Sequence, residues 1–306
     1  MAAKLSVALV LLLSVRSLCH CGEPASMDAR LAPLAKAHKG KVAIAVKHLG
    51  TGESYFRNAD EPMPTASLIK LAVMVEVYQQ AAEGKLKLTD QVLLQKSDRV
   101  PGSGVLTYNF SDGVGFPLRD AVRLMITVSD NTATNLVLEK IGIGATAKRM
   151  EAWGFPNTKI HSKSFRRDTS VFPERSKQFG LGSTTAREMM TLCERLERGK
   201  LVSTEASKEM LDILAHCEDR DKFPRFLPEG VKVAHKTGSV SDARTDAGIL
   251  YLPSGPVALC VLTTGNEDQR WTADNAGNKL CASIAKEVCD CFAALKPASS
   301  ASPKKE

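Results

Sequence analysis

The sequence lacks the patterns by which proteins usually hold metal ions or nucleic acids. It has no Cys-x-x-Cys and no His-Glu-x-x-His motif, and its 6 histidines are scattered, so we expect no metal ion and no other cofactor. The net charge of +7 is modest, and no basic block alternates with aromatic residues. Nucleic acid is therefore not expected as a partner.

Long apolar runs are equally scarce. The one run of note, residues 5–15, follows Met1 and Lys4, and this basic start with a short apolar stretch predicts a secretory signal over residues 1–25. The run is too short to span a bilayer comfortably, so we expect export to the periplasm or the medium without stable membrane insertion. A lipid anchor on Cys19 or Cys21 is less favoured, because Arg16 lies close upstream.

Six further cysteines follow the predicted signal. An exported chain can form disulfides, but six cysteines allow 15 pairings that the sequence does not rank. Two of them, Cys289 and Cys291, are separated by a single residue, too close for an unstrained bridge within a helix. At least one of this pair is therefore expected to be free or to pair elsewhere.

The overall composition is that of an ordinary globular protein. The chain has 306 residues, of which 43% are hydrophobic and 25% charged, enough for a substantial core and about two domains. No exposed apolar stripe is evident, so we expect a monomer.

Strand patterns lie near both ends of the chain, and helical patterns lie between them. Residues 41–49, 54–56, 231–236, 247–252 and 257–262 are predicted strands, while helices are predicted at 27–38, after Ser67, and at 118–128, 132–140, 185–199, 204–216 and 274–295. This order predicts an α/β fold with a mixed sheet formed by both chain ends, flanked by helices, and an inserted all-helical domain. We expect an α/β domain over residues 27–62 and 204–295, a helical domain over 63–203, and a disordered tail over 296–306.

A serine and a lysine three residues apart, Ser67 and Lys70, open one predicted helix. Residues at this spacing share a helical face, so the Lys70 amine can approach the Ser67 hydroxyl. The helix beyond Lys70 is apolar on nearly every side, and a buried lysine tends to lose its proton and become a usable base. The same spacing recurs at residues 283–286 and 302–305, where a solvated helix face and a polar tail explain it.

Two further triplets distinguish Ser67 from those other matches. Ser129-Asp130-Asn131 lies between two predicted helices, and Lys236-Thr237-Gly238 lies at the end of a predicted strand. The first could instead supply caps for the following helix through Ser129 and Asn131, and Lys236 could be a solvated strand end. A glycine in the strand would also let a ligand approach the backbone closely.

The order of the three motifs resembles that of class A β-lactamases and penicillin-binding proteins, and the resemblance extends over most of the mature chain. It implies that Ser67 is the nucleophile that forms an acyl-enzyme and that Lys70 accepts or relays its proton. Ser129 would pass a proton to the leaving nitrogen, and the backbone N–H groups of Ser67 and Ser239 would form the oxyanion hole.

The same resemblance implies a set of substrate-binding residues. Lys236 would keep the local potential positive and, with Thr237, bind the substrate carboxylate, while Asn131 would hold the side-chain amide. The strand after Lys236, with Gly238, would pair with the edge of the substrate. Arg244 resembles a second carboxylate-binding cation, although a salt bridge with a neighbour such as Asp246 explains it equally well.

The sequence departs from class A enzymes in the loop that carries their water-activating glutamate. No glutamate followed by asparagine stands at the family's offset in residues 164–180, where Glu174 and Asp168 are the only carboxylates. Either could serve after a shift of the loop, or both could simply pair with nearby arginines. Three functions stay open: a β-lactamase, a D,D-peptidase, transpeptidase or esterase that penicillin acylates and blocks, and a β-lactam or peptidoglycan sensor without turnover. The expected partner is accordingly a small β-lactam or a cell-wall peptide.

Overall fold

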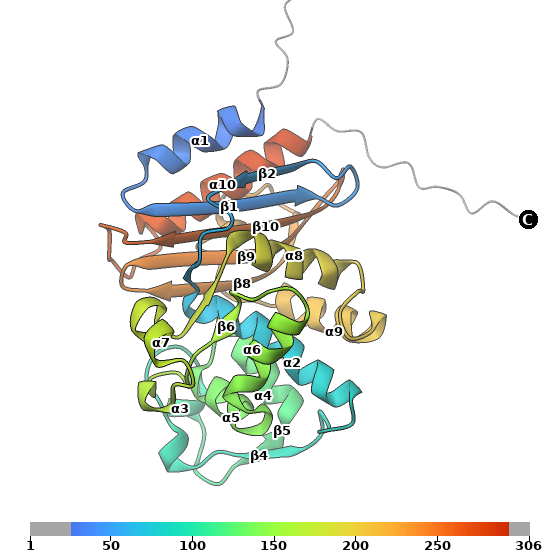
Figure 1. The fold of residues 1–306 in the computed structure, drawn as a ribbon, viewed down its shortest axis with the longest axis vertical. Coiled ribbons are helices and arrows are strands. Elements are labelled where there is room, and N and C mark those ends of the chain that lie inside the picture. The colour runs from blue at the N-terminus through green and yellow to red at the C-terminus, as the bar shows by residue number, and fades with distance from the viewer. Residues whose placement is uncertain (1–25, 294–306) are drawn as a thin grey trace, which may run out of the picture.

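The computed structural model describes residues 26–293, in which one sheet is sandwiched between helices (Figure 1). Helices α1 and α10 cover one face of the sheet, and the other α-helices gather on the opposite side (Figure 1). The predicted signal with Cys19 and Cys21, and the predicted tail, lie outside the described residues. Within the described part, no helix is both long and apolar enough to cross a membrane.

The sheet has five strands in the order β2-β1-β10-β9-β8, so strands from both ends of the chain lie side by side, as predicted. All of its pairings are antiparallel, whereas a mixed sheet was predicted. Tight hairpins join β1 to β2, β8 to β9 and β9 to β10, and a hairpin can only produce an antiparallel pair. Strands β1 and β10 also run antiparallel, although no hairpin joins them. The strands are β1 (Lys41–His48), β2 (Ser54–Arg57), β8 (Lys232–Val240), β9 (Ala243–Leu252) and β10 (Gly255–Thr264).

The two faces of the sheet belong to two separate hydrophobic cores. In β1, Val42 and Ile44 pack in the core that contains α1 and α10, whereas Ala43 and Ala45 pack in the core of the helical side. This alternation follows from the two-residue period of a strand. Because both faces are covered, nearly every residue of β1, β9 and β10 is buried.

Helix α2 (Lys70–Ala82) runs through the middle of the helical side, and ten of its 13 residues are buried, as its all-round apolar pattern predicts. The remaining α-helices are α1 (Met27–Ala37), α3 (Leu106–Asn109), α4 (Leu118–Thr127), α5 (Asn131–Ile141), α6 (Ile143–Ala152), α7 (Pro173–Phe179), α8 (Ala186–Glu197), α9 (Thr204–Ala215) and α10 (Ala276–Ala293). Short strands complete this side: β3 (Met63–Pro64), β4 (Gln91–Leu93), β5 (Gly115–Pro117), β6 (Lys159–Ile160) and β7 (Gly182–Thr184).

Most predicted elements are confirmed, but two strands near the site are longer than predicted. Strand β8 continues beyond residue 236 to Val240, and β9 begins at Ala243 rather than at residue 247. The helix predicted from residue 185 is found as α8, and the Thr185 side chain caps its start by accepting the N–H of Glu188. All six cysteines in the described residues are free. The division into two domains at residues 62/63 and 203/204 stays a prediction.

Candidate active site

Ser67 lies in a single 3₁₀ turn, Ala66–Ile69, that leads directly into α2. The preceding residue, Ala66, has a φ of 46°, a conformation that costs a non-glycine residue free energy and is concentrated at functional sites. Ser67 itself is half-buried, whereas Leu68 and Ile69 beside it are fully buried. The turn therefore anchors itself in the core and leaves its serine at the surface of a cleft.

Lys70 is fully buried at the first residue of α2. Its amine donates to the Ser129 carbonyl oxygen at 2.7 Å, to Ser129 Oγ at 3.3 Å and to Asn131 Oδ1 at 2.9 Å. These hydrogen bonds go to Ser129 and Asn131 rather than to Ser67, which was the expected partner. Burial, together with the charge of Lys236, holds the pKa of Lys70 well below its ordinary value, against the opposing charge of Asp130, so a neutral amine is accessible.

The triplet at residues 129–131 joins α4 to α5. Asp130, rather than Ser129 or Asn131, caps α5, because its carboxylate accepts the Ala133 N–H at 2.8 Å. The same carboxylate accepts two further backbone N–H groups, from Val105 and Leu106. Ser129 has a φ of 55°. With the cap supplied by Asp130, the side chains of Ser129 and Asn131 are left to contact Lys70.

The third motif lies inside β8, which runs beside the Ser67 turn. A Cβ atom on Gly238 would collide with the Thr65 carbonyl oxygen and would lie 2.9 Å from the Leu68 nitrogen, so only glycine permits this approach. Lys236 is fully buried and donates to the Thr237 carbonyl oxygen at 2.8 Å. Burial lowers the pKa of Lys236. Lys236 is therefore not the solvated strand end considered above.

The three motifs meet in a cleft with two parts, both lined by Ser67, Ser103, Ser239 and Trp271. One part, of about 330 Å³, is polar and lined by Ser129, Lys236, Thr237 and Gly238, with Cys217, Glu218 and Asp219 at its far wall. The other, of about 290 Å³, is more apolar and extends past Asn131 to Ser164, Phe165 and Val240. A ligand that reaches Ser67 would thus meet a cation on one side and an apolar wall on the other.

The loop that follows β6 forms one wall of the apolar part but does not bring its carboxylates to the cleft. Asp168 is exposed, and Glu174 has 84% of its side chain exposed and pairs with Lys177. Neither belongs to the lining of either part of the cleft. Of the two interpretations of Glu174, pairing with a nearby cation is therefore the one supported, although that cation is a lysine.

Ser164 is the loop residue that is fastened to the site. The Asn135 side chain accepts the Ser164 N–H at 2.7 Å and donates to its carbonyl oxygen at 3.0 Å. Ser164 lines the cleft, is only 3% exposed, and its hydroxyl has no hydrogen-bond partner within the described residues. A buried hydroxyl of this kind normally binds water or a ligand.

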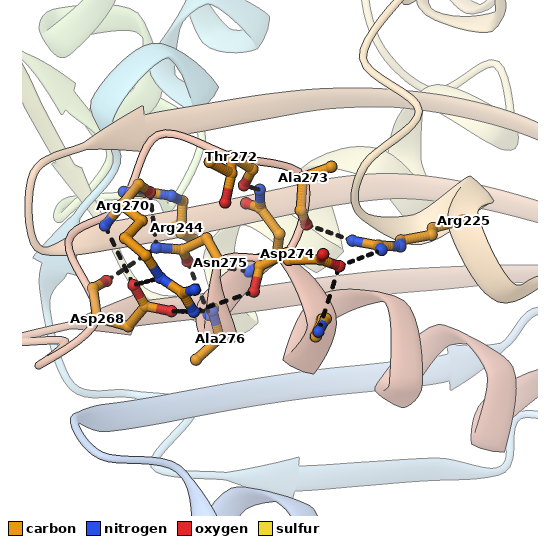
Figure 2. A network of polar contacts seen from close by, with 12 residues as sticks. Arg225, Arg244, Asp268, Arg270, Thr272, Ala273, Asp274, Asn275 and Ala276 are labelled. Atoms are coloured by element: carbon orange, nitrogen blue, oxygen red, sulfur yellow. Dashed lines mark hydrogen bonds and ion pairs between the residues drawn. The ribbon is translucent and has the colours of Figure 1, made fainter.

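Arg244 holds the segment that leads into α10 (Figure 2). Its guanidinium donates to the main-chain oxygens of Val240, Ala243 and Arg270, and it lies 5.0 Å from the centre of the Trp271 ring. The arginine lines a smaller cavity of about 120 Å³ that shares Ser239 and Trp271 with the cleft. Within the described residues Arg244 forms no ion pair, so the salt bridge with Asp246 is not found, and its role as a carboxylate-binding cation stays a prediction.

Sequence reasoning missed several residues at the cleft, namely Ser103, Ser164, Cys217 and Trp271 in its lining and Asn135, which holds the main chain of Ser164. One of them carried a usable signal: Asn135 lies four residues after Asn131, on the same face of α5. The others lie on connecting segments, whose position depends on the packing of the whole chain.

A serine on a helix-leading turn, a buried lysine one turn later and a second cation on the adjacent strand define a serine hydrolase of the class A type. Comparison with known proteins agrees, since the profile of the beta-lactamase enzyme family matches residues 26–292. The chain belongs to this family. A β-lactamase of Streptomyces fradiae is 26% identical over 289 residues, which cover 88% of this chain and 87% of that protein.

Solved structures resemble the fold over nearly their whole length. The β-lactamase of Sphaerobacter thermophilus superposes with a TM-score of 0.78 at 28% identity, covering 88% of this chain and 99% of that one. The structure of PBP-A superposes with a TM-score of 0.75 at 24% identity, covering 87% and 95%. The predicted family is confirmed, and so is the predicted α/β fold class, apart from the mixed sheet, whose pairings are all antiparallel.

Proposed function

We propose that this protein hydrolyses the amide bond of β-lactams through an acyl-enzyme on Ser67. The observation that carries the proposal is the position of Ser67 in the middle of a cleft whose polar side holds the buried cation Lys236. A penicillin-like substrate carries a carboxylate beside its reactive amide, and such a cation next to the nucleophile matches that arrangement.

In the acylation step, Ser67 Oγ attacks the lactam carbonyl carbon and the carbon–nitrogen bond breaks. Lys70, as a neutral amine, takes the serine proton, and the leaving nitrogen receives a proton from Ser129. The hydrogen bond of 3.3 Å between Lys70 Nζ and Ser129 Oγ supports this relay, because a proton can return along it from the lysine to Ser129. The backbone N–H groups of Ser67 and Ser239 stabilise the developing oxyanion.

Substrate binding is assigned to both parts of the cleft. Lys236 and Thr237 bind the carboxylate, Asn131 binds the side-chain amide, and the strand around Gly238 pairs with the substrate edge. Arg244 contributes to the same site through Trp271: its guanidinium lies over the Trp271 ring, and Trp271 lines both parts of the cleft.

Deacylation is assigned to a water molecule that Lys70 activates and that Ser164 positions. Neither Asp168 nor Glu174 is given a catalytic role, because both are exposed and outside the cleft lining. Two observations support this role: Ser164 lines the same part of the cleft as Ser67, and its buried hydroxyl has no hydrogen-bond partner within the described residues.

A second function is favoured by one specific observation. Among the described residues that line the apolar part of the cleft, none is a carboxylate, and a site without a strong base would release its acyl group slowly. The protein would then act on cell-wall peptides, or sense β-lactams, and be blocked by penicillin. A penicillin G acyl-enzyme has been captured in a mutant of PBP-A, one of the structural neighbours.

The short apolar run after Lys4 supports export to the periplasm or the medium. An exported enzyme of this kind would destroy β-lactams before they reach their targets and so confer resistance. Deleting the predicted signal and then fractionating the cells tests this part of the proposal.

The decisive experiment combines turnover of a chromogenic β-lactam with the intact mass of the protein after penicillin treatment. Steady turnover that disappears in Ser67→Ala supports hydrolysis, and a persistent adduct without turnover supports the second function. Ser283→Ala is the matched control, because Ser283 has the same spacing to a lysine but lies on α10. If no adduct forms on Ser67 at any time, both functions are wrong.

A further inference from the structure

A second cluster of reactive side chains reaches the polar part of the cleft through one of its members, Cys217. Cys217, just after α9, lines the same part of the cleft as Ser67 and Lys236, although only 6% of its surface is exposed. The residue beside Lys236 on β8, His235, shares a hydrogen bond with this cysteine. A thiol, an imidazole and the carboxylate behind it therefore form a chain that the proposed reaction at Ser67 does not use.

The carboxylate that holds His235 belongs to Asp246 on β9. His235 Nδ1 lies 2.9 Å from Asp246 Oδ1 and 3.1 Å from Oδ2, and both residues are at most 2% exposed. Burial opposes the charged form of His235, but the charge and hydrogen bond of Asp246, with smaller contributions from the hydrogen bond and charge of Cys217, outweigh it and raise the pKa of His235 to about 10. His235 is thus a cation at neutral pH, and its hydrogen bond with Cys217 brings this charge to the thiol.

The buried charges around Cys217 are unbalanced when the thiol is neutral. Three cations lie here, His235, Lys236 and Lys222, and all are at most 2% exposed. Two carboxylates oppose them: Asp246, which is buried, and Asp219, whose side chain is 31% exposed and accepts a 2.7 Å hydrogen bond from the Lys222 amine. The neighbouring Glu218 lines the cleft but is exposed, so its charge is largely screened by water. A thiolate at Cys217 would complete the balance.

The effect of these neighbours on the thiol is opposite to that of burial alone. Burial disfavours the thiolate, but the hydrogen bond with His235 and the charges of His235 and Lys236 lower the pKa of Cys217 below its ordinary value. Four of the other described cysteines, Cys193, Cys260, Cys281 and Cys289, are also buried, and burial raises the pKa of each thiol. Nucleophilic cysteines occur in cationic surroundings of the Cys217 kind.

We propose that Cys217 is a nucleophilic thiolate that is modified by small disulfides and, when modified, closes the polar part of the cleft. The thiolate attacks one sulfur of the disulfide, a mixed disulfide forms on Cys217, and the other half leaves as a thiolate. No further oxidant is needed, because the small disulfide is itself reduced when the thiol of Cys217 is oxidised. The added group projects beside Lys236 and Thr237, where it excludes a substrate carboxylate.

The test is the reaction of the purified protein with glutathione disulfide, followed by peptide mass mapping. Cys217 should react about tenfold or more faster than Cys291, which is more exposed but whose thiol has a raised pKa. His235→Asn should slow the reaction of Cys217 and leave that of Cys291 unchanged. Mapping by peptide also separates Cys217 from Cys19 and Cys21.

The functional consequence is measured as the rate of Ser67 acylation by penicillin, each variant being normalised to its own untreated rate. Disulfide treatment should lower this rate in the unmodified sequence and in Cys291→Ser, but not in Cys217→Ser. Labelling does not depend on Ser67, so it can succeed even if the proposed function fails. If Cys217 reacts no faster than Cys291, or if His235→Asn folds and reacts at the original rate, the thiolate proposal is wrong. If Cys217 is labelled but the rate of Ser67 acylation does not fall, the proposed closure of the cleft is wrong.

Discussion

Thr65 and Gly238 contact each other through their main chains, so that β8 lies directly against the turn that carries Ser67. The Thr65 carbonyl oxygen also accepts a 2.9 Å hydrogen bond from Thr245 Oγ1 on β9. The nucleophile and the strand proposed to bind the substrate are therefore fastened at one point, immediately before Ser67 and Ser239.

Replacing Gly238 with alanine should separate these two elements. The added Cβ would lie 2.5 Å from Thr245 Oγ1 and 2.9 Å from the Leu68 nitrogen, so β8 must move by a fraction of an ångström or more. A displacement of about 1 Å can cost on the order of a hundredfold in rate, and we expect a loss of that order in Ser67 acylation. Gly144→Ala in α6 is the control, since a Cβ there meets nothing within 4 Å. Equal acylation rates in the two variants would contradict the role of Gly238.

Neutralising the two loop carboxylates should leave turnover nearly unchanged. Asp168 and Glu174 are exposed and lie outside the cleft lining, so Asp168→Asn and Glu174→Gln remove no group near Ser67. We expect changes in kcat below about twofold, as for other exposed substitutions. A strong loss of kcat in either variant, with folding intact, would show that the loop closes onto the acyl-enzyme.

Removing the Ser164 hydroxyl should act on deacylation alone. A single water-positioning hydrogen bond contributes about 1 kcal/mol, so Ser164→Ala should slow deacylation by roughly three- to tenfold and leave acylation unchanged. Quenched-flow mass spectrometry of the acyl-enzyme separates the two steps. The Asn135 clamp on the main chain does not involve the hydroxyl, so the loop should keep its position. A parallel loss in both steps would instead indicate a structural role.

The acylation rate should fall as the pH is lowered through the depressed pKa of Lys70. The amine is a base only when neutral, and burial and the charge of Lys236 favour the neutral form. Lys70→Arg keeps a positive charge at all accessible pH values, so it should acylate slowly and without this pH dependence. A wild-type acylation rate that is constant down to the acidic limit of stability would rule out Lys70 as the base.

The ion pair between His235 and Asp246 should make stability depend on pH in the alkaline range. The pKa of His235 is about 10 in the folded protein and 6.5 in the unfolded chain, so the folded state binds more protons between these values. The stabilisation is therefore complete below pH 6.5 and is lost as the pH rises through about 10. We expect the stability difference between Cys217→Ser and the double variant Cys217→Ser/His235→Asn, measured by urea unfolding, to shrink over this range, because without the thiol only His235 titrates. A constant difference would show that the pair contributes through packing alone.

The sequence was sufficient to predict the sheet from both chain ends and the meeting of the three motifs. The hydrophobic pattern of the sequence predicts the helices and the strand next to which Ser67, the triplet at 129–131 and Lys236 lie. Their arrangement relative to one another was predicted from the family resemblance. The partners of Lys70 and the cap by Asp130 could not be predicted, because several polar residues compete at this junction and packing selects among them. Cys217 and Ser164 were missed because both lie on connections without periodicity.

The pairing of β1 with β10 also has a consequence for how the protein reaches its folded state. Lys41 lies opposite Thr264, so the central pair of strands joins residues from the first and last parts of the chain. Contacts between such distant residues slow folding, because a large loop must close before they form. During synthesis, Ser67 emerges long before Gly238, so its turn must wait for the final hairpins. The site around the nucleophile is thus completed only after strands β8 to β10 have been synthesised.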